Sequence, residues 1–419
     1  MAFVGIQPSF LELKGDRNIR SQKPVRPSCG RVSGRQKARM SFSVLAGVPV
    51  DPAIAVTTVA SIGQLMVAIL VGILSSKRGI LTKDNVKVMS TINYNILLPC
   101  LSLTSVIRAF QTDVIVGLGI LPIVAGLQIL LGLVLGFLFS KILKIESEAD
   151  KRIMIVSSAF INGGTIALFL SSTLFGTNLV KSAEFIAAIS LYLIGWSVLF
   201  WTIGYSILTN WNSRAVEGEA KSAISVRETL ANVSWKRVIS PPIIATVLGA
   251  VIGFTKPLQQ MFLTPRTPLN IVYQGVSGLG VACAPCAVLI LAGSLMNPPA
   301  DNGLVESPVQ VRRRSPRRNL FEILLAVGIT RFVVFPVVTW YFLLSAYHRG
   351  WFARNSMVYF TILLESVMPP AQNIALVLQL ENKPGAASRA AKILLILYIV
   401  ALLPVSIFAS LGATLFFGS

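Results

Sequence analysis

Long apolar stretches separated by short polar connections make up most of the chain from residue 53 onward. Each stretch approaches or exceeds the roughly 20 residues with which an α-helix crosses a bilayer. We count ten of them, at about 53–75, 86–107, 114–140, 152–175, 184–209, 238–255, 268–296, 319–346, 355–380 and 389–417. The pattern predicts an all-α polytopic membrane protein with about ten transmembrane helices in a lipid bilayer.

The ninth stretch is interrupted near its centre. Pro369 and Pro370 each lack an N–H group and clash with the preceding turn, so a regular helix cannot continue through them. Broken backbone at membrane depth is tolerated only where it is buried in protein or lines a cavity. Three polar side chains, Glu365, Gln372 and Asn373, flank the break. Because a kinked helix alone needs no such groups, this pattern favours one half of a transport site.

Helix-breaking residues recur at corresponding places in the two halves of the chain. The corresponding positions are Asn162-Gly163-Gly164 with Pro369-Pro370, and Pro99 with Pro285. Five spans in each half is an odd number, so two homologous halves would lie inverted in the bilayer, as in many secondary transporters. We therefore predict two inverted five-helix repeats, 51–209 and 238–417, joined by a cytosolic-type loop at 210–237. Paired interrupted spans are a sequence signal for a transporter site.

Charge supports the number of spans. Charged residues make up 13% of the chain, against about 25% in soluble proteins. The odd-numbered connections carry 21 Lys and Arg residues and the even-numbered connections only six. By the positive-inside rule, the odd-numbered connections face the cytosol or its organellar equivalent. The net charge of +20 therefore reflects membrane topology, and we expect no nucleic-acid partner.

Residues 1–50 differ from the rest of the chain. They contain nine Lys and Arg residues against only Glu12 and Asp16, with scattered serines and prolines. This composition is typical of an organellar transit peptide, and a disordered basic tail is the alternative. The tail favours the plastid envelope as location, with the endoplasmic reticulum membrane as the alternative.

Several motifs of this chain are similar to those of the auxin efflux carrier family, and within it the PIN-LIKES branch. The motifs are Lys77-Arg78-Gly79-Ile80-Leu81-Thr82, Asn95-Ile96-Leu97-Leu98-Pro99-Cys100-Leu101, Asn162-Gly163-Gly164, Ser240-Pro241-Pro242-Ile243, Ala284-Pro285-Cys286, Leu291-Ala292-Gly293-Ser294 and Pro369-Pro370-Ala371-Gln372-Asn373-Ile374. The resemblance implies that the broken fourth and ninth spans cross near the membrane midplane. It also implies an auxin or a small carboxylate as substrate. Two departures concern the substrate: Gly163-Gly164 replaces the crossing proline of the plasma-membrane carriers, and Ser294 replaces the asparagine usual in the branch.

The broken spans provide a chemical reason for binding an anion. A broken helix exposes N–H groups and a partial positive charge at the start of its second half. A carboxylate is stabilised there without a full cation. Asn162, Gln372 and Asn373 can add hydrogen bonds to the substrate, although the same amides can instead satisfy the broken backbone. Asn95, one turn from Pro99, is the further candidate for the cavity.

Arg331 and Glu365 are the charges that we place deep in the membrane. Each costs about 2.5–3.5 kcal/mol at the centre of a helix, so we expect them to form a buried pair between adjacent spans. A static pair would fix packing. The alternative is a coupling or gating pair in which Glu365 is neutral in one state and paired with Arg331 in the other.

Enzymatic chemistry and cofactors have little support in the sequence. The chain has one histidine and four cysteines, which suit neither a metal or haem centre nor a disulfide framework. We find no H-E-x-x-H motif, no Asp pair and no Ser–His arrangement, so we expect no enzyme, no metal and no cofactor. The favoured function is a secondary carrier of a small organic anion, with an auxin-like indole carboxylic acid as first candidate. The alternatives are a proton- or sodium-coupled carboxylate or bile-acid-type carrier and a non-transporting receptor or scaffold, with a homodimer left open.

Overall fold

The computed structural model describes residues 52–111, 118–145, 147–175, 178–209, 239–297, 316–349 and 356–417. The basic tail at 1–50 and the connection at 210–237 lie outside these ranges. The described residues are helical apart from turns and a single β-bridge. The structure therefore confirms the all-α class.

The helices follow the apolar stretches of the sequence. In chain order they are α3 (Pro52–Lys77), α4 (Lys83–Ile92), η1 (Asn93–Leu97), α5 (Leu98–Ala109), α7 (Leu121–Ile142), α8 (Glu148–Ala159), α9 (Gly163–Leu174), α10 (Leu179–Leu199), η2 (Phe200–Gly204), α11 (Tyr205–Thr209), α14 (Pro241–Phe254), α15 (Lys256–Leu263), α16 (Pro268–Val281), α17 (Cys283–Met296), α18 (Pro316–Ile329), η3 (Thr330–Val334), α19 (Phe335–Arg349), α20 (Ser356–Ser366), α21 (Asn373–Leu380) and α22 (Pro384–Phe417). Each predicted stretch coincides with one helix or with two or three consecutive ones.

Six helical stretches in the described ranges are long and apolar enough to cross a membrane. They are Lys83–Ala109, Leu121–Ile142, Val180–Thr209, Pro268–Met296, Arg318–Arg349 and Pro384–Phe417. The helices α14 and α15 form a seventh if they count as one span, although they meet at 105°. The fourth and ninth stretches are each divided into two short helices. Each half of an interrupted span is thus too short to be counted as a membrane-crossing helix by its length. The number of ten spans stays a prediction.

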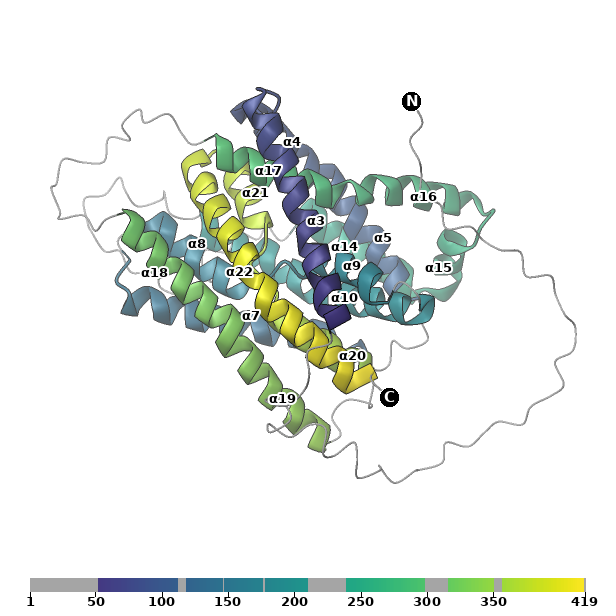
Figure 1. Ribbon diagram of the computed structural model, residues 1–419. Coiled ribbons are helices and arrows are strands. Elements are labelled where there is room, and N and C mark those ends of the chain that lie inside the picture. Colours follow the sequence, from purple (N-terminus) through teal and green to yellow (C-terminus); the bar gives the residue numbers. More distant parts are fainter. Residues whose placement is uncertain are drawn as a thin grey trace, which may run out of the picture. The chain divides into compact units, whose positions relative to one another are not determined.

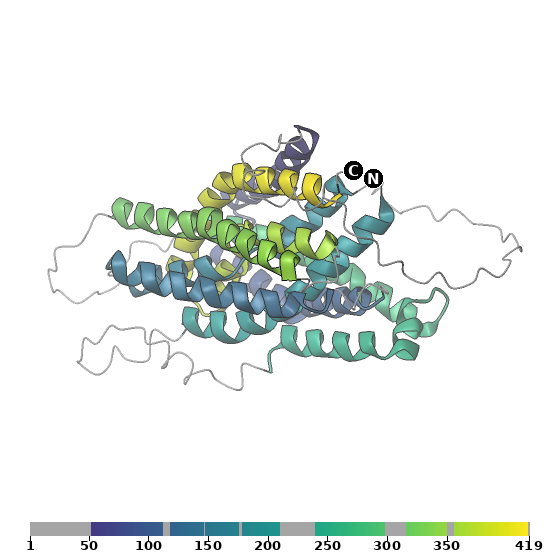
Figure 2. The ribbon, with the colours of Figure 1, turned by 90° about the horizontal axis from the view of Figure 1, so that it is seen from below.

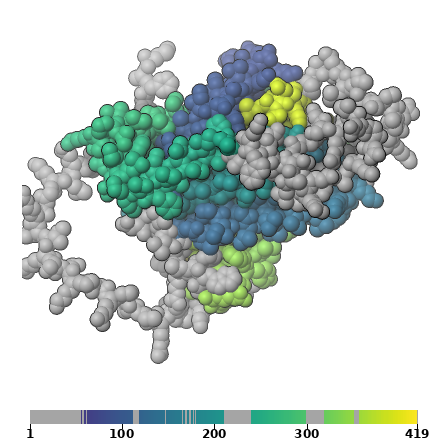
Figure 3. Space-filling view, turned by 180° about the vertical axis from the view of Figure 1, so that it is seen from behind, coloured from purple at the N-terminus to yellow at the C-terminus, as the bar shows by residue number. Residues whose placement is uncertain are grey.

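The outer surface of the bundle is apolar, as a lipid-facing surface should be. On α7 the exposed side chains include Ile123, Leu127, Leu130 and Val134, which recur every three or four residues and form one stripe. The polar Gln128 on the same helix is buried. Figure 3 shows α7 and the α14–α16 segment forming much of the surface seen from behind. An apolar exposed stripe over an interior that is also apolar is typical of a multi-pass membrane protein.

The interior is formed by α22 and the helices that pack on it. In Figure 1 α22 crosses the front of the bundle between α3 and α18, and it contacts α3, α17, α20 and α21. From below, α7 and the long α18–α19 helix lie side by side (Figure 2). The two broken spans are therefore enclosed on several sides by unbroken helices, which satisfies the condition for irregular backbone within a membrane.

A close contact between α7 and α8 fixes the position of the first break. Gly132 of α7 lies against the end of α8, where an added Cβ would approach the carbonyl oxygen of Ser158 to 2.7 Å. Small residues allow transmembrane helices to approach at backbone distance. The residues that follow α8 are thereby held at the centre of the bundle.

Candidate functional site

The two broken spans cross and are joined through their backbones. The amide of Asn162 donates to the carbonyl of Pro369 at 2.7 Å, and the amide of Ala371 donates to the carbonyl of Phe160 at 3.0 Å. These bonds form an antiparallel bridge between Ile161 and Pro370. Each break thus satisfies backbone groups of the other. The predicted breaks and their crossing are confirmed.

Span ten also holds the crossing in place. The Asn162 side-chain amide donates to the hydroxyl of Tyr398 on α22 at 3.0 Å, and that hydroxyl donates to the carbonyl of Pro370 at 3.0 Å. Tyr398 therefore connects both breaks to one unbroken helix. Asn162 has two functions in consequence, because it supports the crossing and also borders the cavity described below.

Arg331 contacts the second break in a way that the sequence did not predict. Its buried guanidinium donates from Nε and Nη2 to the carbonyl of Met368, at 3.2 and 3.1 Å. Nη2 also lies within 3.2 Å of the Glu365 carbonyl and 3.4 Å of the Ser366 carbonyl. The Glu365 and Ser366 carbonyls lie in the last turn of α20 and the Met368 carbonyl lies just after it, at the negative end of the half-helix, where a fixed cation is favourable.

The expected ion pair between Arg331 and Glu365 is not formed in this conformation. Within the described residues neither carboxyl oxygen of Glu365 has a hydrogen-bond partner, and the side chain is fully buried. The carboxyl instead lies against Gly163, the first residue of α9. The prediction of a static pair is wrong for this conformation because the guanidinium is occupied by backbone carbonyls. The hypothesis of a coupling pair stays a prediction.

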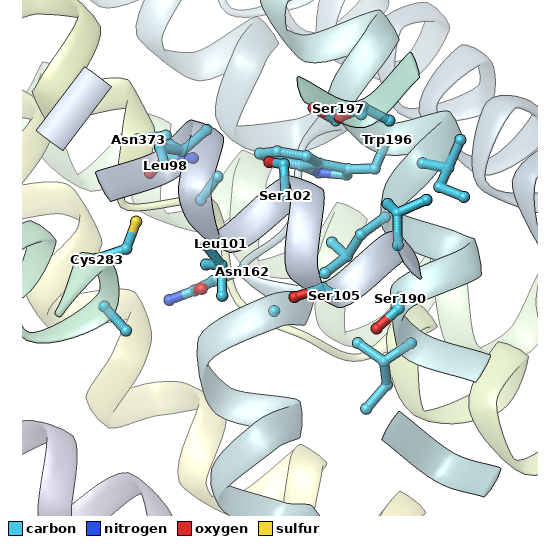
Figure 4. A pocket seen from close by; sticks show the side chains of 18 of the residues that line it. Leu98, Leu101, Ser102, Ser105, Asn162, Ser190, Trp196, Ser197, Cys283 and Asn373 are labelled. Carbon is cyan, nitrogen blue, oxygen red and sulfur yellow. The ribbon is translucent and has the colours of Figure 1, made fainter. Parts of the chain in front are cut away.

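A cavity lies beside the crossing. Counted together with the open space at its mouth, it measures about 1020 Å³. Its lining comes from α5, the first break and α9, α10, η2, α14, α17 and the second break with α21. Figure 4 shows the Trp196 ring beside Ser102 on one side, with Asn162 and Ser105 opposite.

Only part of the predicted set of substrate-binding residues lines this cavity. Asn162, Gly164, Gln372 and Asn373 line it. The predicted residues that do not line it are Asn95, Pro99, Gly163, Pro285, Pro369 and Pro370. The prolines and Gly163 shape the helix breaks and the close contacts behind the cavity.

Asn95 is displaced from the cavity by a local change in helical pitch. The π-helical segment η1 widens one turn of the second span, directly before Pro99. Asn95 is exposed and donates to the carbonyl of Thr91 in its own helix at 2.9 Å. Asn93 is buried instead. Because a π-helical turn changes the direction in which the following side chains point, a regular α-helix could not predict which of the two asparagines is buried.

Both half-helices begin at the cavity without a capping side chain. Neither Asn162, before α9, nor Gln372, before α21, caps the helix that follows it. Such a start carries a partial positive charge and N–H donors that no capping side chain takes, although at α21 the Ile374 and Ala375 amides donate to the carbonyls of Ala371 and Gln372. The cavity lining contains no acidic or basic side chain. The anion-attracting groups of the cavity are therefore helix ends and amides.

Hydroxyl and indole groups complete the cavity, and the sequence analysis missed them. Ser102 and Ser105 are three residues apart on α5, Ser190 and Ser197 are seven apart on α10, and Trp196 lies beside them. These spacings place each pair on one helix face. Polar residues that repeat on one face of an apolar span were the signal that could have found them.

One end of the bundle is closed by polar contacts between spans of the two halves. Arg389 at the start of α22 pairs with Asp150 of α8 at 3.2 Å. Glu381 accepts a hydrogen bond from Tyr205 of α11 at 2.6 Å, and Lys383 donates to the carbonyl of Thr209 at 3.0 Å. We refer to these contacts as the charged end. They lie at connections that the loop charges place on the cytosolic side.

These geometric features define an α-helical membrane protein with a central cavity at two crossed, broken spans. The comparisons give the family. A family model described as membrane transport protein matches residues 57–409, and the chain belongs to this family. The predicted resemblance to auxin efflux carriers of the PIN-LIKES branch is confirmed.

Relatives at low identity extend over most of the chain. Protein PIN-LIKES 7 of Arabidopsis thaliana is 22% identical over 374 residues, which cover 79% of this chain and 90% of the relative. Protein PIN-LIKES 5 of the same plant is 20% identical over 366 residues, with 77% and 88% covered. An uncharacterised transporter of Saccharomyces cerevisiae is 22% identical over 303 residues, with 58% and 70% covered. Membrane transport is named in the description of the family model and in the name of the yeast relative.

Proposed function

We propose that this protein is a secondary carrier of a small organic anion and that the cavity at the crossing is its substrate site. The observation that carries the proposal is that two uncapped half-helix starts, from the two halves of the chain, border one cavity. A carboxylate placed there would meet backbone N–H groups and the amides of Asn162 and Asn373. Membership of a membrane transport family supports the same function.

The rest of the lining favours an aromatic weak acid. Trp196 and several leucine and isoleucine side chains present an apolar surface, and the serine hydroxyls present scattered donors and acceptors. An indole carboxylic acid combines a flat apolar ring with one carboxylate, so it matches both parts of the cavity. A compact dicarboxylate would leave much of the apolar lining unused. We therefore propose an auxin-like acid before malate or a bile-acid-type anion.

Alternating access would arise from movement of one helix group against another around the crossing. Matching breaks at α8–α9 and α20–α21 support two inverted repeats, 51–209 and 238–417. The cavity lining on α10 ends before the charged end, which joins spans four and five to the segment between α21 and α22. We propose that the charged end is a closed gate in this conformation and opens in the other.

Transport by purified protein in lipid vesicles tests the proposal. We expect saturable uptake of labelled indole-3-acetate by the wild type. Asn373→Ala should lower uptake at least about tenfold, the equivalent of ~1.4 kcal/mol, because it removes an amide at the cavity. Asn162→Ala should do the same, and its folding is checked by size-exclusion chromatography because it also loses the bond to Tyr398. Asn95→Ala is the matched control and should transport normally, since Asn95 faces away from the cavity.

Other outcomes would separate the rival functions. Saturable flux of malate without flux of indole-3-acetate would keep the site and change the substrate. Folded wild type that moves no tested anion would support a non-transporting receptor or scaffold. If Asn95→Ala lowers the flux as much as Asn373→Ala does, the substrate binds elsewhere.

The location of the protein is a separate proposal. The basic tail at 1–50 supports import into plastids, and the endoplasmic reticulum membrane is the alternative. Fluorescent fusions with and without residues 1–50 test it. If the plastid location is right, loss of the tail should abolish plastid fluorescence.

A further inference from the structure

The carboxyl group of Glu365 is a buried ionisable group that the cavity does not use. Its side chain is fully buried, and it does not line the cavity. Neither oxygen has a hydrogen-bond partner among the described residues. A carboxylate removed from water normally keeps a cation or several hydrogen-bond donors. A charged Glu365 would be unsupported in this conformation.

The position of this carboxyl couples it to the crossing. It lies against Gly163, where an added Cβ would come within 2.8 Å of the Glu365 Cδ atom. Gly163 begins α9, and its neighbours Asn162 and Gly164 line the cavity. The start of one half-helix therefore contacts Glu365 on one side and the substrate cavity on the other. A movement of this half-helix would change the surroundings of both.

The groups that act on Glu365 come from two elements packed near it. Arg331 of η3 donates to the backbone carbonyl of Glu365 at 3.2 Å, and α10, which carries Tyr192, packs against α20. The Tyr192 hydroxyl donates to the Gln128 side chain of α7 at 2.7 Å, so this hydroxyl is already engaged. Arg331 is thus the partner with a full charge that could reach the carboxylate after a rearrangement.

In the described part of the chain, the charged groups of the other helices packed near Glu365 lie toward the helix ends, among them Arg389 and Lys392 near the start of α22. From α22 the nearest titratable group at the crossing is Tyr398, whose hydroxyl donates to Pro370. The basic residues of α19 in the described range, His348 and Arg349, lie in its last turn. The described part of α7 contributes Lys141 only in its last turn. Movement of the Arg331 guanidinium from the backbone carbonyls to the Glu365 carboxylate is therefore the simplest charge rearrangement at this place.

We propose that Glu365 is the proton-binding site of this carrier. The carboxyl holds a proton in the conformation seen here, while Arg331 is bound to the carbonyls that end α20. In the opposite-facing conformation the proton leaves to the aqueous phase, and the guanidinium turns from those carbonyls to the carboxylate. One proton then accompanies each substrate anion. This inference rests on the proposed transport function and specifies its coupling.

The same geometry makes sodium binding at the carbonyls of the second break unfavourable. Sodium would need oxygen ligands, and the carbonyls of Glu365, Ser366 and Met368 already accept from Arg331. The guanidinium acts as a built-in cation at the end of a half-helix. Replacement of sodium by potassium in the transport buffer should therefore leave flux unchanged.

Two measurements in vesicles, substrate exchange and net accumulation, distinguish proton coupling from transport itself. Exchange of labelled for unlabelled indole-3-acetate is measured at equal pH on both sides, and accumulation is measured with a one-unit pH difference. For one proton per anion the limit is about tenfold accumulation, which diffusion of the neutral acid also reaches, so the carrier is measured as the initial rate of accumulation above that of protein-free vesicles. Glu365→Gln, a neutral mimic, should keep exchange and lose this accumulation. Glu322→Gln is the matched control and should keep both, because Glu322 pairs with the exposed Arg318 on α18.

Three results would overturn the inference. Glu365→Gln could keep the gradient-driven accumulation, which would show that coupling lies elsewhere. Folded Glu365→Gln could lose exchange and accumulation together, which would show a structural role. Finally, the infrared spectrum of the wild type could show no protonated carboxylic-acid band that disappears in Glu365→Gln. This last measurement needs no substrate, whereas absence of exchange in the wild type would instead contradict the proposed function.

Discussion

Gly163→Ala is the substitution that tests the crossing most directly. Gly163 begins α9, and an added Cβ would lie 2.8 Å from the Cδ atom and 3.0 Å from the Oε1 atom of Glu365, with Oε2 nearer still. Carbon atoms make favourable contact only at about 3.5–4.0 Å. The methyl group and the carboxyl therefore cannot occupy their places together. The buried carboxyl would have to move within a packed interior.

The destabilisation expected for Gly163→Ala can be estimated by comparison with the next residue, Gly164. Extra methyl groups in a packed core cost about 1–3 kcal/mol, while alanine in a helix gains up to ~1 kcal/mol over glycine. At Gly164 the nearest atom to an added Cβ is the Leu193 Cδ1 at 3.3 Å, the end of a flexible side chain. We therefore expect Gly164→Ala to be nearly neutral and Gly163→Ala to destabilise the protein by ~1–2 kcal/mol.

Thermal unfolding of the purified protein in detergent ranks these variants. Membrane proteins often unfold irreversibly, so the apparent midpoints are compared at one scan rate. A double-mutant cycle identifies the cause: Glu365→Ala removes the carboxyl and should make the added Gly163→Ala tolerable. Equal midpoints for Gly163→Ala and Gly164→Ala would refute the reasoning. The absence of rescue by Glu365→Ala would also refute it.

Two further predictions concern the contacts that hold the crossing and close one end. Tyr398→Phe removes the hydroxyl between Asn162 and Pro370 and should cost ~1–3 kcal/mol, measured as a lower apparent midpoint; an unchanged midpoint would show that the hydroxyl is dispensable. Asp150→Arg should lower the midpoint, because it places a second cation beside Arg389 at a side chain that is only 9% exposed; the loss of the pair itself contributes only ~0.5–1 kcal/mol, since Arg389 is 52% exposed. The added Arg389→Asp should restore the midpoint if this pair contributes, and a further decrease would contradict that.

The helix breaks were predictable because they follow from covalent structure. Pro369 and Pro370 cannot continue a helix, and the glycines after Asn162 permit a break at the corresponding place. The apolar stretches likewise predicted helices, because a bilayer requires internally hydrogen-bonded segments. These features need no knowledge of which residues meet in space.

The partners of the polar side chains were not predictable in the same way. The cost of burying charge suggested that Arg331 and Glu365 would bind each other, but broken helices supply another acceptor, the carbonyls in the last turn of α20 and just after it. Asn95 was expected in the cavity because α-helical geometry was assumed through η1. Both errors arise where the backbone departs from a regular helix. The sequence indicates that a departure occurs but not how it redirects neighbouring side chains.

The glycine in the fourth span and the unpaired carboxyl in the ninth form one structural feature. In sequence, Gly163 is a departure from the proline that the family resemblance places at the crossing of the plasma-membrane carriers. The structure supplies a reason, because the Glu365 carboxyl occupies the place that any side chain at this position would need. A proline ring there would collide with the carboxyl or displace it toward Arg331. The two residues therefore constrain each other, and a relative with a side chain at the first position should lack a buried carboxyl at the second.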